Sequence, residues 1–198
     1  MTRIKKMIQY WLRANLFLFF LVLMFFVNYR DWVEKGYIGV VMIVSMSELL
    51  IIILSIVSAL TFRTPPPRKR ISLSDWPIGL LVLAMFYVLT QYVVIKGENL
   101  PPNPSFLIAF LLLINSVIAL FSLLFPTAIV YIHDGNVHAQ EKTFSNSLFK
   151  YLALFMNGVN AEAQRTLLRL PFVFHRLLAV IVFVLLFLIA GSIGFIFE

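Results

Sequence analysis

The chain has 198 residues, of which 61% are hydrophobic and only 13% are charged, with a formal net charge of +7 and no cysteine. Soluble domains carry about 25% charged residues, so this composition leaves too little polar surface for a water-facing globule. The lack of cysteine excludes disulfides, thiolate metal sites and a cysteine nucleophile.

The N-terminal region, residues 1–13, is basic and is followed by an apolar run over residues 16–27. This order resembles a signal peptide, but the run continues into Asn28-Tyr29-Arg30-Asp31-Trp32, which contains no small-residue cleavage site. The pattern therefore favours an uncleaved first span, with the Arg13 side chain reaching the lipid headgroups.

Five apolar segments are long enough to cross the hydrocarbon layer, which takes about 20 helical residues. We predict spans over residues 11–29, 38–62, 77–96, 106–132 and 177–197. The predicted fold is all-α, a multi-pass transmembrane helix bundle of about five spans with a short helical cytoplasmic segment. Residues 1–132 form the transmembrane bundle, residues 133–176 the cytoplasmic segment and residues 177–198 the last transmembrane helix.

Lysine and arginine are distributed unequally among the loops. Thirteen of the 16 lysine and arginine residues lie in three segments, residues 1–13, 63–70 and 133–176, and only Arg30, Lys35 and Lys96 lie elsewhere. Three consecutive prolines make the linker at 63–70 stiff. Cytoplasmic loops are enriched in these residues, so we expect an inner-membrane protein with its N-terminus in the cytoplasm and its C-terminus outside. The orientation of the protein in the membrane accounts for its positive net charge, so no direct nucleic-acid binding is expected.

The cytoplasmic segment is predicted to form two short helices. The first covers residues 145–157 and ends at Gly158, and the second is capped by Asn160 and stopped by Pro171. The first helix is too apolar to face water on all sides, so either an interfacial helix or a docking surface accounts for it. The basic side chains predicted to bind lipid headgroups or a protein partner are Lys142, Lys150, Arg165 and Arg169.

Glu48 is the only acidic side chain within a predicted span, where a charge costs about 3 kcal/mol. Helical spacing puts Ser45 and Ser55 on its face, and Gln91 and Asn115 lie at a similar depth in other spans. We therefore predict an intramembrane polar cluster of Glu48, Ser45, Ser55, Gln91 and Asn115. Interhelical packing, a proton or ion pathway, and sensing through protonation all remain open as its role.

No pattern in the sequence predicts a catalytic residue, a metal site or a cofactor. His133 and His138 are five residues apart rather than four, and Asp134-Gly135-Asn136 between them signals a turn. Glycine-rich nucleotide loops, metalloprotease histidine pairs and nucleophile elbows are absent from the sequence. Ala190 and Gly194 form a small-xxx-small pair that favours close helix contact, within one chain or between chains.

These features favour a non-enzymatic membrane subunit that forms a homo-oligomer and couples the lipid bilayer to a cytosolic protein. The alternative is a small proton-coupled transporter or channel centred on Glu48.

In length and layout, as a multi-pass bundle with a basic cytoplasmic side, the whole chain resembles the KwaA family, the small membrane component of the two-gene Kiwa anti-phage system. The resemblance implies a bacterial inner-membrane oligomer that senses phage-induced disturbance of the envelope and signals to a cytosolic, DNA-binding partner. Accessory membrane subunits of secretion or conjugation machines share this layout.

Overall fold

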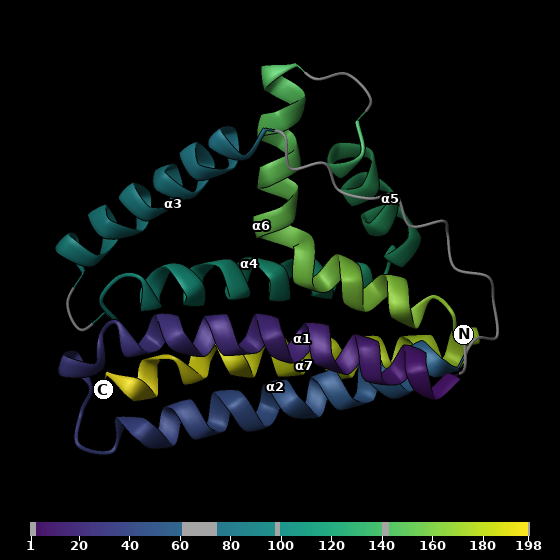
Figure 1. Ribbon diagram of the computed structural model, residues 1–198, viewed down its shortest axis with the longest axis horizontal. Helices are drawn as coiled ribbons and strands as arrows, with labels where there is room; N and C mark the ends of the chain where they lie inside the picture. Colours follow the sequence, from purple (N-terminus) through teal and green to yellow (C-terminus); the bar gives the residue numbers. More distant parts are fainter. Residues whose placement is uncertain (1–2, 61–74, 98–99, 140–142, 198) are drawn as a thin grey trace.

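The computed structural model describes residues 3–60, 75–97, 100–139 and 143–197 (Figure 1). In these residues the chain is helical and contains no strand, which confirms the predicted all-α, multi-pass bundle. The helices are α1 (Arg3–Phe26), η1 (Tyr29–Asp31), α2 (Gly36–Ala59), α3 (Trp76–Lys96), α4 (Ser105–Ser122), α5 (Pro126–Val137), α6 (Phe144–Leu167), α7 (Phe172–Ser192) and η2 (Gly194–Ile196). The predicted linker at 63–70 lies outside the described residues.

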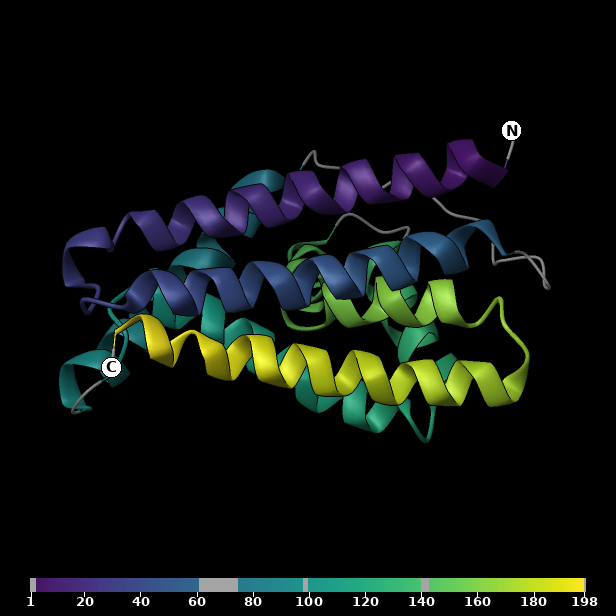
Figure 2. The ribbon, with the colours of Figure 1, turned by 90° about the horizontal axis from the view of Figure 1, so that it is seen from below.

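Four long helices, α1, α2, α4 and α7, run side by side along the long axis of the molecule (Figures 1 and 2). α2 packs against both α1 and α7, and α7 also packs against α4. The core they share includes Val182 and Leu186 of α7 and two fully buried alanines, Ala119 of α4 and Ala179 of α7. Alanine at buried positions lets neighbouring backbones approach closely, which is how membrane helices commonly associate.

The turn after α7 closes one end of this bundle against the start of α2. The backbone N–H of Val33 donates to the carbonyl oxygen of Ile196 over 3.1 Å. A Cβ atom at Gly36 would lie 2.5 Å from that oxygen, and one at Gly39 would lie 2.8 Å from the Ile196 side chain. Glycine at these two positions therefore permits a contact that no larger residue allows.

The predicted fourth span, residues 106–132, is two helices rather than one. α4 ends at Ser122, and α5 begins at Pro126. Proline lacks a backbone N–H and disfavours helical geometry in the residue before it. Phe125 accordingly leaves the helical region, with φ −128° and ψ 57°.

The predicted turn at Asp134-Gly135-Asn136 is also wrong, because all three residues lie inside α5. One face of α5, with Val130, His133 and Val137, is buried, and the Asp134 carboxylate pairs with Arg165 of α6. Tertiary packing and this ion pair outweigh the local preference of these residues for a turn.

The two short helices predicted for residues 145–170 are one continuous helix, α6, so Gly158 does not end a helix and Asn160 does not begin one. Figure 1 shows that the first half of α6 runs antiparallel to α5, across the bundle axis, before the helix bends. We call α5 and the first half of α6 the hairpin. The second half of α6 runs along the bundle, and its Ala163 and Leu167 belong to the main core.

α3 diverges from the other long helices, and its N-terminal end lies against α6 (Figure 1). Gly79, Val82, Phe86 and Thr90 form its buried stripe, at spacings of three and four residues that place them on one face. A Cβ atom at Gly79 would lie 2.5 Å from the ring of Tyr151. α3 therefore joins the rest of the molecule through the first half of α6 and, further along, through α4.

Candidate functional site

Five helices are long and apolar enough to cross a membrane: α1, α2, α3, α4 and the last segment, Phe172–Ile196. Large apolar side chains are exposed along all of them, such as Phe19 on α1, Ile52 on α2 and Phe187 on α7. A bilayer covers such a surface, whereas water would not tolerate it. The chain is an integral membrane protein with several spanning helices.

No known protein family, curated protein or solved structure matches this chain.

The predicted polar cluster does not assemble in one place. Glu48 is half-buried between α2 and α1, where the Asn15 side-chain amide lies 3.5 Å from its carboxylate. Gln91 accepts a 3.0 Å hydrogen bond from Asn103 in the loop after α3. Asn115 bonds to α6 instead. Glu48, Gln91 and Asn115 share a depth in the sequence pattern, but α2 packs on α1, α6 and α7 rather than on α3 or α4.

The two serines of that cluster also differ in their surroundings. Ser45 is exposed, whereas Ser55 is buried and donates a 2.6 Å hydrogen bond to the carbonyl oxygen of Ile51 in its own helix. They lie on different parts of the α2 surface, and neither bonds to Glu48.

Asn115 instead joins a spanning helix to the middle of α6. Its side-chain nitrogen donates to the carbonyl oxygen of Phe155 at 3.1 Å, and its side-chain oxygen accepts from the backbone N–H of Asn160 at 3.2 Å. These two backbone groups lie in the middle of α6, where Figure 1 shows the bend. A side chain that inserts against the helix backbone is an established cause of helix bending.

The Asn115 contact continues into a chain of buried polar side chains. Asn160 donates to Ser122 of α4 at 2.9 Å and to Asn157 at 3.0 Å, and Gln164 donates to Asn160 at 3.4 Å. Asn160 and Gln164 are fully buried. A buried amide network of this kind fixes one relative position of α4 and α6, because each displaced amide would lose its partners.

The three predicted docking cations that the structure describes do not form a free basic face. Lys150 donates to Asp75 at 2.6 Å, Arg165 pairs with Asp134 and with Glu162, and Arg169 donates to the carbonyl oxygen of Ser58 at 3.2 Å. Lys142 lies outside the described residues. The three described cations therefore tie α6 and the segment after it to α3, α5 and α2.

Burial and these ion pairs together shift the pKa values of three groups outside the spans. Burial acts to raise the pKa of Asp75, but hydrogen bonds from Lys150 and Ser147 outweigh it and hold that pKa below its ordinary value. Burial and the nearby Asp75 charge raise the pKa of Tyr151. Burial lowers the pKa of His133; Asp134 acts in the opposite direction and Arg165 in the same one. Among the described residues, no three potential ligand side chains are arranged to hold a metal ion.

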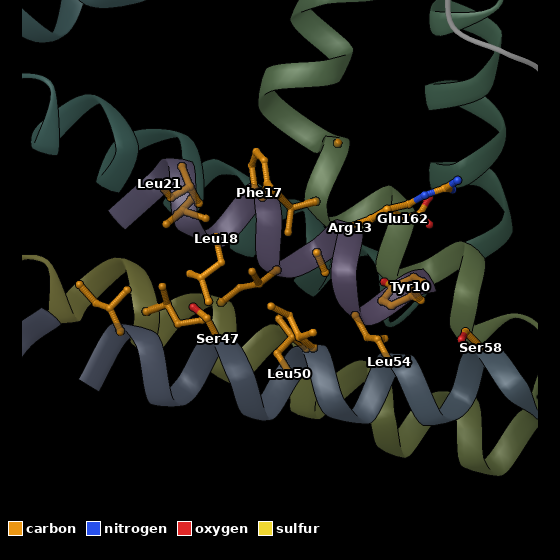
Figure 3. Close-up of a pocket in the computed structure, with 18 of the residues that line it drawn as sticks. Tyr10, Arg13, Phe17, Leu18, Leu21, Ser47, Leu50, Leu54, Ser58 and Glu162 are labelled. Atoms are coloured by element: carbon orange, nitrogen blue, oxygen red, sulfur yellow. The ribbon is translucent and has the colours of Figure 1, made fainter. Parts of the chain in front are cut away.

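A cavity of about 1030 Å³ lies between α1 and the other bundle helices (Figure 3). Leu18 of α1 points into it, opposite Leu50 and Leu54 of α2. Towards the N-terminal end of α1 the lining becomes polar and basic, with Tyr10 and Arg13 among its residues. Sequence reasoning missed this cavity, although α1 carries its lining at spacings of three and four residues.

Proposed function

We propose that this protein is a non-enzymatic membrane subunit that couples the packing of its spanning helices to a partner protein through the α5–α6 hairpin. The observation that carries the proposal is the pair of hydrogen bonds between the Asn115 side chain of α4 and the backbone of α6. Because α6 is bent at that point, a shift of α4 would change the direction of the first half of α6 and so move the hairpin.

Ion pairs made by α6 before and after its contact with Asn115 support this role for the helix. Lys150 ties the first half of α6 to the start of α3, and Arg165 ties the second half to α5. Arg169, just after α6, is bonded to the end of α2. A helix held at these points responds to the arrangement of several spans, which is what a relay between bilayer and partner requires.

In this proposal the N-terminal end of α1 and the hairpin face the cytoplasm, in an inner membrane, and several copies assemble. The hairpin exposes Tyr131 of α5 and Phe144 and Phe149 of α6, which are large apolar side chains on helices that do not span. Exposed aromatic residues of this kind suit a protein contact. The resemblance to the KwaA family adds a stimulus, disturbance of the envelope by phage, and a cytosolic partner.

Spin-label distances test the coupling. The chain has no cysteine, so cysteines introduced at Phe149 and Phe187, both exposed, carry the only labels. We expect Asn115→Leu to shift or broaden the distance distribution between them, because both hydrogen bonds to α6 are lost. The matched control is Ser116→Ala, since Ser116 is also fully buried on α4 but bonds only to Leu113 of its own helix. An unchanged distribution in Asn115→Leu would contradict the coupling.

Photo-crosslinking in cells tests the partner. A crosslinking residue at Tyr131 or Phe149 is expected to capture a cytosolic protein, and Asn115→Leu is expected to reduce the yield. The same residue at Phe187, on the exposed apolar surface of α7, is the control. Absence of a protein adduct from both hairpin positions, with the protein present at normal level, would refute a partner role for the hairpin.

A further inference from the structure

The cavity beside α1 is large and mostly apolar. Its volume of about 1030 Å³ is at the upper end of the roughly 300–1,000 Å³ of small-molecule sites. The cavity is partly open rather than enclosed, and the apolar side chains that line it lack packing partners unless a molecule fills it. Water is a poor occupant next to apolar surface. An apolar occupant rather than water therefore suits its inner part, where Leu18, Phe25, Leu50 and Leu186 line it.

The polar end of the cavity is positively charged. Lys6 and Arg13 of α1 and Arg169 after α6 line it together with Tyr10 and one acid, Glu162. The Glu162 charge is offset by Arg165, whose guanidinium lies 3.8 Å away. Lysine and arginine side chains next to a tyrosine hydroxyl provide the donors that a phosphate group needs.

One face of α1 contributes residues to both the basic end and the apolar inner part of the cavity. Lys6, Tyr10, Arg13, Phe17 and Leu21 lie at spacings of three and four residues, so they follow one another along one face. The lining changes from basic to apolar after Arg13. A phospholipid has the same order, with a charged headgroup at the membrane surface and acyl chains towards the midplane.

The cavity is open to the surface of the molecule along α1. Lys6, Arg13 and Phe17 line the cavity and are also exposed on the surface of the molecule. In Figure 3, Arg13 extends from α1 towards Glu162, across the polar end of the cavity. A lipid of the surrounding leaflet therefore reaches this site without passing through the bundle.

We propose that the cavity between α1 and α2, α6 and α7 binds an anionic phospholipid, whose phosphate meets Lys6, Arg13 and Arg169 and whose acyl chain lies among the apolar side chains. This inference does not rest on the proposed role of the hairpin. A protein that binds lipid here and shows no Asn115-dependent coupling would refute only the latter.

Native mass spectrometry of the detergent-solubilised protein tests the site, with phosphatidylglycerol and phosphatidylcholine as competing probes. We expect one retained phosphatidylglycerol per chain, in clear preference to phosphatidylcholine. Lys6→Gln with Arg13→Gln should reduce that preference about tenfold or more, because both α1 cations that face the headgroup phosphate are then lost. The matched control is Arg3→Gln with Lys5→Gln, two exposed cations of α1 that do not line the cavity.

Filling the cavity tests the acyl-chain part. Leu50→Trp is expected to abolish lipid retention, whereas Leu16→Trp, on an exposed position of α1 outside the cavity, should leave it unchanged. If Leu50→Trp does not yield a monodisperse protein, Leu21→Trp, at a partly buried lining position, replaces it. Equal retention of both lipids, unaffected by the charge variants, would overturn the proposal. Displacement of phosphatidylglycerol by inorganic phosphate alone would also overturn it, because the site would then hold a free anion.

Discussion

Lys150 of α6 donates a 2.6 Å hydrogen bond to the carboxylate of Asp75, the residue before α3, so one ion pair joins helices that lie far apart in the sequence. The Lys150 side chain is only 8% exposed and that of Asp75 is 20% exposed. We expect Asp75→Asn to lower the free energy of unfolding by about 2 kcal/mol, less than the roughly 3–5 kcal/mol of a fully buried pair. Thermal unfolding in detergent measures this loss.

Two variants make that measurement specific. Lys96→Gln, which removes an exposed cation at the other end of α3, should have no effect on stability beyond about 0.5 kcal/mol. Asp75→Asn combined with Lys150→Met should recover most of the loss, because no buried charge then remains unpaired. If the double variant is as unstable as the sum of its single changes, the ion pair is not the cause.

The same pair predicts a dependence on pH. The pKa of Asp75 in the folded protein lies below its ordinary value of 3.8, so the pair stabilises the protein fully above that value. This stabilisation is lost as the pH falls through the lower, folded-state pKa. We expect the difference in Tm between the wild type and Asp75→Asn to be constant from about pH 5 to pH 8 and to shrink below about pH 4. A difference that grows on acidification would contradict this assignment.

Gly36 and Gly39 provide a test of the contact between α2 and the C-terminal turn. We expect Gly36→Ala to cost about 1–3 kcal/mol, because its Cβ atom would lie 2.5 Å from the carbonyl oxygen of Ile196. Gly191→Ala is the control, since no atom outside its own stretch of helix lies within 4 Å of its added Cβ and alanine favours a helix by about 1 kcal/mol. Unfolding temperatures of the two variants should therefore change in opposite directions.

Reporter fusions test the orientation. Positive residues near the spans favour the cytoplasmic side, so fusions after Pro67 and Ala161 should report cytoplasm. Fusions after Asn99 and Glu198 should report the outside. A cytoplasmic signal after Glu198 would mean that one of the five candidate helices does not cross the bilayer.

Glu48 and Asn15 form a polar contact between α1 and α2. Glu48→Gln should preserve association of the two helices, because glutamine keeps the acceptor oxygen that faces the Asn15 amide. Glu48→Leu should weaken it by about 0.6–2 kcal/mol, the range of single interhelical hydrogen bonds in membranes. Ser45→Leu, at an exposed position on the same helix, is the control. Crosslinking between cysteines introduced in α1 and α2 measures association; equal yields in Glu48→Leu and the wild type would show that the contact is dispensable.

The existence of the spans could be predicted because an apolar run of sufficient length needs no information about its neighbours. The hairpin could not be predicted, because the local sequence of α5 and α6 is compatible with turns as well as with helices. Asp134 and Gly135 favour a turn locally, and only the pairing of Asp134 with Arg165 and the packing of His133 show why they are helical. Gly158 signals a helix end by type, yet it lies within α6.

The predicted polar cluster failed for a related reason. Depth along a span can be calculated from helical rise, but which helices are neighbours depends on packing that the sequence pattern does not specify. The sequence pattern therefore marks Asn115 as a candidate residue but predicts the wrong partners for it. Asn157, Asn160 and Gln164 could have indicated these partners, since spacings of three and four put them on one face of a helix. The predicted break at Gly158 instead placed Asn157 in one helix and the other two in the next.

The Asn115 contact also has a consequence for biogenesis. The backbone groups that its amide meets lie 40 and 45 residues further along the chain. When α4 leaves the ribosome and enters the translocon, the nitrogen of Asn115 already has the Leu111 carbonyl of its own helix, but its oxygen still lacks the Asn160 N–H. α4 must therefore enter the lipid with an unsatisfied acceptor, and the bond forms only after Asn160 has been synthesised. Docking of α6 on α4 is thus a late step that follows insertion of α4, and a chain truncated before Asn160 would keep this acceptor unsatisfied.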